Sequence, residues 1–333
     1  MKIQLLVAIT DNDYMEHFSK VLRGKYADFL EISVCSSADH MREAIYKHRY
    51  DILIADPEAM ENVTIQNVAL SLILWDGTSS LNEPICTTKV IQKYQRISEI
   101  VSKMLEYYSE VSSKTGAFKK SKGKTTVVWS PSGGSGKTTV ALAYAANVVS
   151  DGKKVIYLNL ENFSSTDVYF SQTDKSISSV FSRLGSNIEM LLRSIRQQDG
   201  SSGIYYFGQP ENYDDINELT EDDLSILVEN CADSVDELVI DLSSSCNGRT
   251  IKLFEMADSI LLVVDSSRVS RVKWGQFTSQ NKVYKDIQHK SVMILNRAAR
   301  MEQSGDIKMI LLPVVQSNDP VVVYKTLSGD YWK

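Results

Sequence analysis

The chain alternates between short apolar runs and stretches whose apolar residues recur at helical spacing. Helices are predicted in the first part of the chain at Tyr14–Arg23, Ala38–His48 and Ile97–Val111. Alternating strands and helices are typical of a doubly wound α/β domain with a parallel sheet. We therefore expect a five-stranded parallel sheet in this part, with four of its strands given by the following apolar runs: Ile3–Ile9, Leu30–Val34, Tyr50–Ala55 and Leu70–Trp75.

The second part of the chain has the same pattern at a larger scale. Its apolar runs are short and unbroken, as in parallel strands that are buried on both faces. We expect a mostly parallel sheet flanked by helices. Its predicted strands are Thr126–Trp129, Lys154–Leu160, Glu237–Asp241, Ala257–Asp265, Val292–Arg297 and Met309–Leu312.

Composition places the chain among globular proteins. It has 333 residues, of which 43% are hydrophobic and 23% charged, and its mean hydropathy is −0.17. This length favours two domains. No apolar run approaches the ~20 residues that span a bilayer, and the N-terminus is expected to be a strand, not a signal peptide. The four cysteines and four histidines lack metal-ligand spacing, which favours a reducing cytoplasm without disulfides or zinc.

Charge divides the chain into three parts. Residues 1–111 have a net charge of −5 and residues 125–333 a net charge of −6, whereas residues 112–124 contain five lysines and no acid. The basic stretch is too polar to fold alone, so we interpret it as a flexible, solvated linker. A contact with acidic lipid or nucleic acid is the alternative. The expected domains are residues 1–111 and 125–333.

A glycine-rich motif follows the predicted strand Thr126–Trp129. A strand, a glycine loop and a helix together can cradle phosphate on backbone N–H groups at the helix N-terminus. Lys137 is expected to reach the β- and γ-phosphates of ATP, and Thr138 to ligate Mg²⁺. The residues predicted to bind nucleotide here are Gly133, Gly134, Ser135, Gly136, Lys137, Thr138 and Thr139.

This motif departs from the usual phosphate-loop pattern GxxxxGK[ST], because Pro131 occupies the first glycine position. The doubled glycine in GGSGKTT resembles the deviant Walker A loop of the MinD/ParA family of ATPases. In that family a signature lysine precedes the two glycines and crosses a nucleotide-sandwiched dimer. Ser132 occupies that position here and cannot supply the charge.

The resemblance to this family assigns roles to later residues. Asp241 matches the Walker B acid that holds Mg²⁺, and Glu161 matches an acid that positions water or contacts Mg²⁺ and acts in catalysis with Lys137. Asn296 and the adjacent Arg297 match the adenine-reading end of a strand, and Pro313 lies near the loop that covers the base. Each of three residues also has a purely structural interpretation. Glu161 would be an acid at a strand end, Asn296 a turn residue, and Pro313 a residue that ends a regular element at a loop. The family usually has Asp at the Asn159 position and Pro-Pro-Gly at residues 243–245, where this chain has Asn and three serines.

The first domain resembles the receiver domain of response regulators. Asp56 matches the phosphoacceptor, Lys93 the lysine that contacts the phosphoryl group, and Asp11 with Asp13 the Mg²⁺-binding acids. Asn12 replaces the second acid, and Trp75-Asp76 stand where a switch Thr or Ser is expected. We therefore expect an atypical receiver that serves in docking or dimerisation, with phosphorylation of Asp56 as the alternative.

The order of receiver-like domain, linker and ATPase-like domain resembles the TadZ/CpaE proteins of type IVb (Flp/Tad) pilus systems, as does the segment Ile91–Gln95. This resemblance implies a cytoplasmic homodimer that places pilus assembly, often at a cell pole or beside the inner membrane through protein partners. The C-terminal sequence VVVYKTLSGDYWK lacks a basic amphipathic helix, so direct membrane insertion is not expected. Tyr331 and Trp332 are interpreted as a frayed tail, with a small docking patch as the alternative.

Several functions follow from these resemblances. The first is an ATP- and Mg²⁺-dependent dimer that recruits pilus-assembly proteins and hydrolyses ATP slowly. The alternatives are a nucleotide-stabilised scaffold, a response-regulator-type signalling protein, and a ParA/MinD-like partition or positioning ATPase. Both domains have a net negative charge, which argues against a large nucleic-acid-binding surface.

Overall fold

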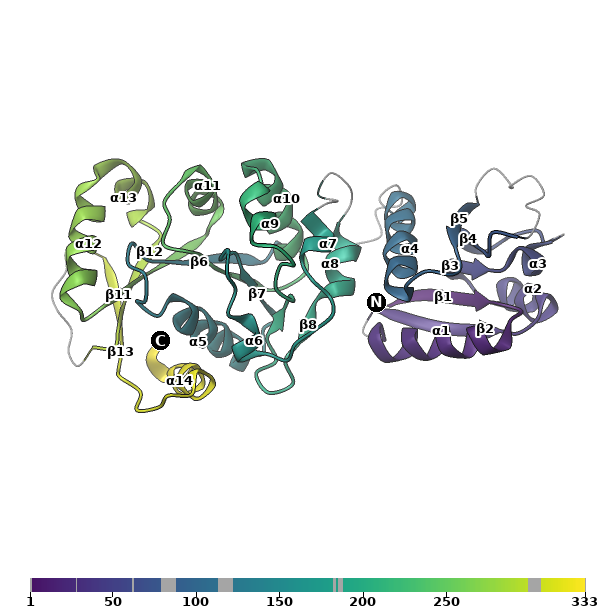
Figure 1. Cartoon of the computed structure of the whole chain (residues 1–333), viewed down its shortest axis with the longest axis horizontal. Coiled ribbons are helices and arrows are strands. Elements are labelled where there is room, and N and C mark those ends of the chain that lie inside the picture. The colour runs from purple at the N-terminus through teal and green to yellow at the C-terminus, as the bar shows by residue number, and fades with distance from the viewer. Residues whose placement is uncertain are drawn as a thin grey trace. The chain divides into compact units, whose positions relative to one another are not determined.

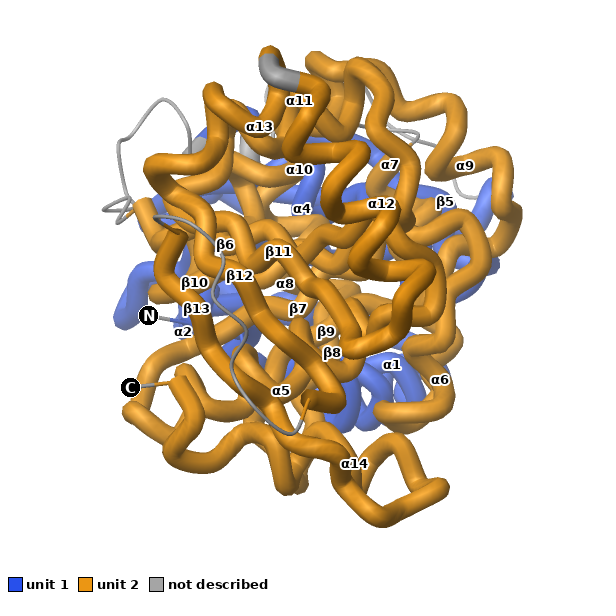
Figure 2. Tube along the Cα trace, turned by 90° about the vertical axis from the view of Figure 1, so that its left-hand side faces the viewer, with its two compact units in different colours: residues 1–119 blue, residues 120–333 orange. Residues whose placement is uncertain are grey.

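The computed structural model describes residues 2–27, 29–61, 63–78, 88–112, 122–181, 184, 188–298 and 307–332. The chain divides into two compact units, residues 1–119 and 120–333 (Figure 2). Most of the predicted linker 112–124 lies outside the described residues, so the exact domain boundaries stay a prediction. Among the described residues, no helix combines the length and apolar character needed to span a membrane.

Unit 1 contains a five-stranded, wholly parallel sheet in the order β2-β1-β3-β4-β5, which is the flavodoxin-like order. This arrangement confirms the fold class expected for the first domain. The side chains of α2 and α3 pack on one face of the sheet, against Leu6 and Leu53. The elements are β1 (Ile3–Ala8), α1 (Asn12–Lys25), β2 (Leu30–Cys35), α2 (Ala38–Lys47), β3 (Tyr50–Ala55), α3 (Pro57–Met60), β4 (Val68–Trp75), β5 (Lys89–Gln92) and α4 (Ile97–Ser112).

Unit 2 contains an eight-stranded sheet in the order β13-β12-β11-β6-β10-β7-β9-β8. All its neighbouring strands are parallel except the short pair β8 and β9. The strands are β6 (Lys124–Trp129), β7 (Val155–Asn159), β8 (Gln197–Gln198), β9 (Tyr205–Tyr206), β10 (Glu237–Asp241), β11 (Ser259–Asp265), β12 (Ser291–Asn296) and β13 (Lys308–Leu312).

Helices cover both faces of this second sheet, as Figure 1 shows. Side chains alternate between the faces: Leu238 and Ile240 of β10 pack toward α8 and α10–α13, and Val239 packs toward α5 and α14. The helices are α5 (Lys137–Ser150), α6 (Thr166–Tyr169), α7 (Ser178–Phe181), α8 (Glu189–Ile195), α9 (Tyr213–Glu218), α10 (Glu221–Ala232), α11 (Gly248–Met256), α12 (Arg268–Ser279), α13 (Asn281–Gln288) and α14 (Pro320–Leu327).

The C-terminal residues correct one expectation. Residues Asp330–Trp332 form a 3₁₀ helix instead of a frayed tail. The Trp332 indole N–H donates to the Leu327 carbonyl at 2.8 Å, and its ring meets the Tyr144 ring of α5 edge-on, with centroids 5.2 Å apart. The end of the chain packs against α5 because the large aromatic surface of Trp332 lies next to this apolar helix. The polar residues around Trp332 in the sequence do not indicate this packing.

Candidate functional site

The phosphate-loop motif lies at the centre of the unit 2 sheet. It runs from the end of β6 to the start of α5, with β11 and β10 on either side of β6. Gly136 is the N-cap of α5 and provides no capping side chain. The first N–H groups of α5 are therefore available to an anion, which the helix dipole also attracts.

Two glycines of the loop adopt left-handed backbone conformations, Gly134 at φ 73° and Gly136 at φ 90°. A Cβ atom on Gly136 would lie 2.3 Å from the side-chain nitrogen of Asn296. Glycine is thus required at this position both for its backbone angle and for the close approach of a neighbouring side chain.

Asn296 and Arg297, at the end of β12, donate hydrogen bonds to carbonyl groups of the phosphate loop. The Asn296 amide donates to the Ser135 carbonyl at 2.9 Å. The Arg297 guanidinium donates to the Gly134 carbonyl and to the Asp265 carboxylate at 2.9 Å. Arg297 itself has a positive φ of 55°. The amide nitrogen of Asn296 thus donates to the loop, whereas its oxygen Oδ1 has no hydrogen-bond partner among the described residues and is able to accept from adenine, the contact that the sequence predicts.

The Lys137 side chain is buried and held by two neighbours. Its ammonium group donates to the Ser244 hydroxyl at 3.2 Å and lies 3.7 Å from a Glu161 carboxylate oxygen. The structure thus brings together Lys137 and Glu161, the two residues that were predicted to act together in catalysis. The contact with Ser244 was missed, although the three serines after β10 had been noted as a departure from the family sequence.

Asp241 ends β10 and is completely buried. Its Oδ2 atom accepts a hydrogen bond from the Tyr157 hydroxyl at 2.9 Å and one from the Asn159 amide at 3.4 Å. Burial, followed by the nearby Glu161 carboxylate, raises the pKa of Asp241 to about 7. Tyr157 was missed because a tyrosine within an apolar strand looks like any other core residue.

Other contacts act in the opposite direction and lower the pKa of Asp241: the hydrogen bonds from Thr138 and Tyr157 and, after them, the Lys137 charge. Burial raises the pKa of Glu161, and the Lys137 charge opposes that rise. Two carboxyl groups thus lie near one lysine in a site with little solvent, a combination that favours binding of further positive charge.

Three buried polar atoms around the loop have no hydrogen-bond partner in the described part of the chain: Ser135 Oγ, Asp241 Oδ1 and Asn296 Oδ1. Buried polar groups without partners are rare and costly, unless a ligand or water satisfies them. Ser135 belongs to the loop, Asn296 contacts it through the Ser135 carbonyl, and Asp241 interacts with Thr138 at the start of α5. The three atoms fit a ligand that carries phosphate, a cation and a hydrogen-bond donor.

A Mg²⁺ ion is compatible with these side chains. Among the residues that the structure describes, no three Asp, Glu, His or Cys side chains gather into a metal cluster. Mg²⁺ usually keeps several waters and takes one or two carboxylates together with substrate phosphates. Asp241 and Thr138 would be its protein ligands here.

The other residues predicted to contact nucleotide lie at the border of the site. Gly133 is exposed, and Thr139, on the first turn of α5, interacts with the Tyr169 hydroxyl of α6. Pro313 directly follows β13, and two strands separate β13 from β6. Ser132 is 4% exposed, and its N–H donates to the Ser130 hydroxyl at 3.1 Å.

Unit 1 places Asp56 and Lys93 together at the carboxyl end of its sheet. The Lys93 ammonium group lies 3.3 and 3.4 Å from the two Asp56 carboxylate oxygens. Asp56 Oδ2 also accepts from the Thr10 N–H at 3.0 Å and from the Thr10 hydroxyl at 3.1 Å. Thr10 was missed, although it directly precedes the acids that the sequence singled out. The Asp56 carboxylate is therefore paired with a cation, and its Oδ2 atom accepts two further hydrogen bonds.

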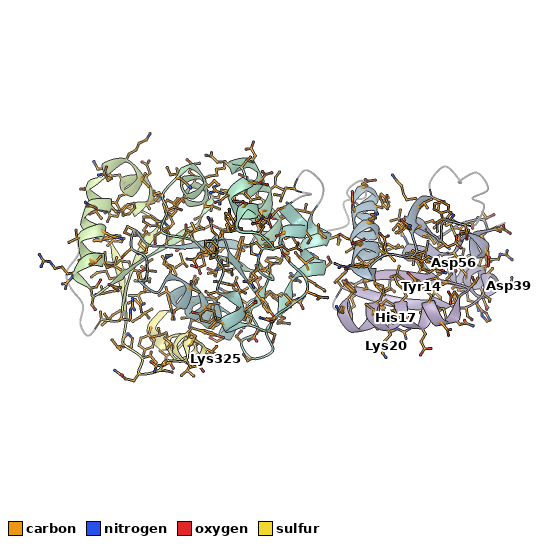
Figure 3. All side chains as sticks on the ribbon, in the orientation of Figure 1. Tyr14, His17, Lys20, Asp39, Asp56 and Lys325 are labelled. Carbon is orange, nitrogen blue, oxygen red and sulfur yellow. The ribbon has the colours of Figure 1, made fainter. Side chains whose placement is uncertain are left out.

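Tyr14 lies beside this ion pair, and both Tyr14 and Asp56 are labelled in Figure 3. The Lys93 ammonium lies 4.9 Å from the centre of the Tyr14 ring, and the Tyr14 hydroxyl donates to the Lys93 carbonyl at 2.9 Å. Burial, with the Asp56 charge next, raises the pKa of Tyr14 to about 12. Asp11 caps α1 through the Tyr14 N–H, 3.9 Å from Lys93, and Asp13 is exposed. Asp11 and Lys93 thus lie at the Asp56 site, whereas Asp13 is exposed, and Mg²⁺ binding by Asp11 and Asp13 stays a prediction.

No protein-family model and no curated protein sequence matches this chain. Solved structures of MinD/ParA-family ATPases resemble it. A ParA-family ATPase from Chlorobium tepidum TLS is 18% identical, with a TM-score of 0.52 over 62% of this chain and 92% of its own. The cell-division ATPase MinD from Pyrococcus furiosus is 14% identical over 62% of this chain and 97% of its own, with a TM-score of 0.48. At this identity the likeness to the Chlorobium tepidum structure is one of fold, and it confirms the expected mostly parallel sheet with flanking helices.

Proposed function

We propose that unit 2 binds ATP together with Mg²⁺, that the ATP-bound form pairs with a second copy, and that this pair positions other proteins in the cell. The observation that carries the proposal is the set of three unpartnered buried atoms around the phosphate loop, next to the free N–H groups of α5. Triphosphate, a divalent cation and an adenine amino group are together the partners that these atoms lack.

Each part of the site has a distinct role in this proposal. The backbone N–H groups from Gly134 to Thr139 bind the phosphates, and Lys137 exchanges Ser244 and Glu161 for phosphate oxygens. Asp241 and Thr138 hold Mg²⁺, which when bound neutralises phosphate charge. The free oxygen of Asn296 accepts a hydrogen bond from the base.

Hydrolysis is proposed to be slow. Ser132 replaces a lysine and Asn159 replaces an acid in the pattern that this loop resembles, and both changes remove charge from the reaction site. A cationic finger in phosphoryl transfer contributes about 10³–10⁵ in rate. A Ser132→Lys variant should therefore hydrolyse ATP faster than the wild-type chain, and a wild-type rate above that of the variant would refute this point.

The cellular role that we propose is the positioning of type IVb pilus assembly through protein partners. The order of the two units and the degenerate motifs resemble proteins of that system, and the ParA-like fold supports the broader role of a partition or positioning ATPase. In unit 1, Asn12 in place of the second acid and Trp75-Asp76 at the expected switch position support a docking or dimerisation module that works without phosphorylation.

The test is a pair of measurements on the full chain. Titration with a fluorescent ATP analogue and Mg²⁺ measures binding, and light scattering measures mass with ATP, with ADP and without nucleotide. Binding, together with a doubled mass only in ATP, supports the proposal. Absence of binding refutes it, and an unchanged mass with bound ATP favours the scaffold alternative.

A further inference from the structure

A tyrosine and an asparagine of β7 contact the acid that we assign to Mg²⁺. Asn159 lies opposite Asp241 in the register of β7 with its parallel neighbour β10, and Tyr157 precedes Asn159 by two positions. Side chains two positions apart on a strand point to the same face, and Tyr157 packs with side chains of α5 on that face. The topology thus places a phenol hydroxyl and an amide beside the Asp241 carboxylate, on the face of the sheet that α5 covers.

The Asp241 carboxylate has an asymmetric set of partners. Its Oδ2 atom accepts from the Tyr157 hydroxyl at 2.9 Å and from the Asn159 amide at 3.4 Å, and both donors belong to β7. Its Oδ1 atom is buried and has no hydrogen-bond partner among the residues that the structure describes. The carboxylate is therefore held through one oxygen, while the other is available to accept from a ligand or to bind a cation.

Asn159 joins this network through both ends of its amide group. The nitrogen donates to the Tyr157 hydroxyl at 2.9 Å, and the oxygen accepts from the Glu161 N–H at 3.0 Å. An ionised aspartate at this position would have no N–H group to donate, and it would face the Asp241 carboxylate as a second negative charge. The asparagine therefore suits the tyrosine, whose own proton is needed for the hydrogen bond to Asp241.

The ring of Tyr157 is fixed by packing. It is 1% exposed, and its centroid lies 6.0 Å from that of Phe170, which stacks on Tyr206 of β9 with centroids 4.3 Å apart. A tyrosine side chain has few rotatable bonds, so packing of the ring also fixes the position of the hydroxyl. The aromatic group of Tyr157, Phe170 and Tyr206 is thus a rigid support for the contact with Asp241.

We propose that Tyr157 and Asn159 are positioning residues for the cation: they hold the Oδ2 atom of Asp241, which leaves Oδ1 available to the Mg²⁺ that accompanies ATP. Partners that hydrogen-bond a metal ligand from outside orient it, and their loss typically lowers metal affinity by about 10- to 100-fold. This inference rests on the proposed binding of ATP with Mg²⁺, and it names the residues of this chain that orient the acid.

A purely structural role of Tyr157 predicts a different result. A buried tyrosine hydroxyl usually has a hydrogen-bond partner wherever it lies, and the Tyr206 hydroxyl donates to the Ser171 carbonyl at 2.8 Å. Tyr206 is 4% exposed and belongs to the same aromatic group, but its hydrogen bond goes to the backbone. Removal of either hydroxyl should lower stability to a similar extent, whereas only the hydroxyl of Tyr157 should affect the cation.

Tyr157→Phe in the full chain tests the proposal, with Tyr206→Phe as the matched control. Each chain is saturated with a non-hydrolysable ATP analogue and titrated with Mn²⁺ as the probe for Mg²⁺, and electron paramagnetic resonance measures the Mn²⁺ that stays free. Tyr157→Phe should bind Mn²⁺ about tenfold more weakly than the wild-type chain, because Asp241 Oδ2 then keeps only the longer contact with Asn159. Tyr206→Phe should bind Mn²⁺ like the wild-type chain.

Binding of the analogue in EDTA separates positioning of Asp241 from damage to the whole site. Without a divalent cation, Tyr157→Phe should bind the analogue with the wild-type affinity, because the phosphate loop itself is unchanged. Equal Mn²⁺ affinities of Tyr157→Phe and the wild-type chain would overturn the proposal, as would an equal loss of affinity for the analogue in EDTA. If the wild-type chain binds no analogue under any condition, the proposed function itself fails.

Asn159→Ala gives a second reading of the same network and replaces the first variant if thermal melts show that Tyr157→Phe folds poorly. It removes the amide contacts with Tyr157 and Asp241 and should also weaken Mn²⁺ binding. Because both residues act on one oxygen atom, Tyr157→Phe/Asn159→Ala should lose less affinity than the product of the two separate factors. A loss equal to that product would show that the two residues act independently and would overturn their joint assignment.

Discussion

The ammonium group of Lys137 lies 3.2 Å from the hydroxyl of Ser244, although 107 residues separate them in the chain. Ser244 follows β10 directly after the Asp241 segment, and Lys137 begins α5. In the proposed ATP-bound state, a phosphate competes with Ser244 and Glu161 for the Lys137 ammonium group. The proposal thereby links the loop after β10 to the occupancy of the phosphate site.

Removal of the lysine should weaken nucleotide binding. A hydrogen bond to a charged group contributes about 1.5–3 kcal/mol, so Lys137→Ala should lower the affinity for the ATP analogue by about 10- to 100-fold. Lys153→Ala, which removes an exposed lysine after the same helix, is the control and should bind normally. Equal affinities of the two variants would contradict the assignment of Lys137.

Asp241→Asn should stabilise the ligand-free chain in a pH-dependent way. The carboxyl has a pKa of about 7 when folded and an ordinary value of 3.8, so the folded state keeps a proton that the unfolded state releases between these pH values. The wild-type chain therefore loses stability as pH rises from about 4 to about 7, by a few kcal/mol, and the loss stays constant above pH 7.

Thermal melts of the wild type and of Asp241→Asn at pH 5 and pH 8, without nucleotide or Mg²⁺, check this linkage. The advantage of the variant should grow between these two values, on the order of 2–4 °C for each kcal/mol. In the same variant Mg²⁺-dependent ATP binding should be lost. A pH-independent difference between the melting temperatures would show that the Asp241 carboxyl is not protonated in the folded chain.

Gly136→Ala should impair nucleotide binding far more than Gly133→Ala. The added Cβ at position 136 would lie 2.3 Å from the Asn296 amide and would sit on a backbone with φ 90°, whereas nothing lies within 4 Å of a Cβ at position 133. The double variant Gly136→Ala/Asn296→Ala relieves the contact but keeps the backbone strain, and it also lacks the proposed contact of Asn296 with the base. Its affinity is therefore compared with that of Asn296→Ala alone, and it should stay below that reference. An affinity equal to that of Asn296→Ala would assign the whole effect of Gly136→Ala to the contact with Asn296.

Asp56 should resist phosphorylation by a small acyl phosphate with Mg²⁺. Both of its carboxylate oxygens lie within 3.4 Å of the Lys93 ammonium, and Thr10 donates two further hydrogen bonds to one of them. Intact-mass analysis should detect no adduct on the wild-type chain. An adduct that disappears in Asp56→Asn would revive the signalling alternative.

Trp332→Ala should destabilise unit 2. The substitution removes the edge-on contact with Tyr144 and the hydrogen bond to Leu327, and we expect a loss of about 1–3 kcal/mol in the free energy of unfolding. Tyr331→Ala is the control, because Tyr331 is 39% exposed and surface substitutions usually change stability by less than about 0.5 kcal/mol. Chemical denaturation followed by circular dichroism compares the two variants.

The sequence by itself determined the features that depend on local patterns. Unbroken apolar runs predicted the parallel strands, and the glycines between Trp129 and Lys137 predicted the loop and the start of α5. The run Glu237–Asp241 was predicted as a strand that ends in an acid, and such an acid lies at the carboxyl edge of its strand; the role expected for Asp241 came from the resemblance to the MinD/ParA family. Whether a segment forms a strand or a helix depends on residues a few positions away in the chain, so the sequence itself carries that information.

Only the tertiary structure decided which side chains meet. The order and register of the strands bring distant loops to one edge of a sheet. This is why Ser244 contacts Lys137, why Asn296 binds the Ser135 carbonyl, and why Thr10 donates to Asp56. The packing of Trp332 on Tyr144 likewise depends on where α14 ends against α5. Such contacts join residues far apart in the chain, and a change of register by one residue would turn each side chain to the other face.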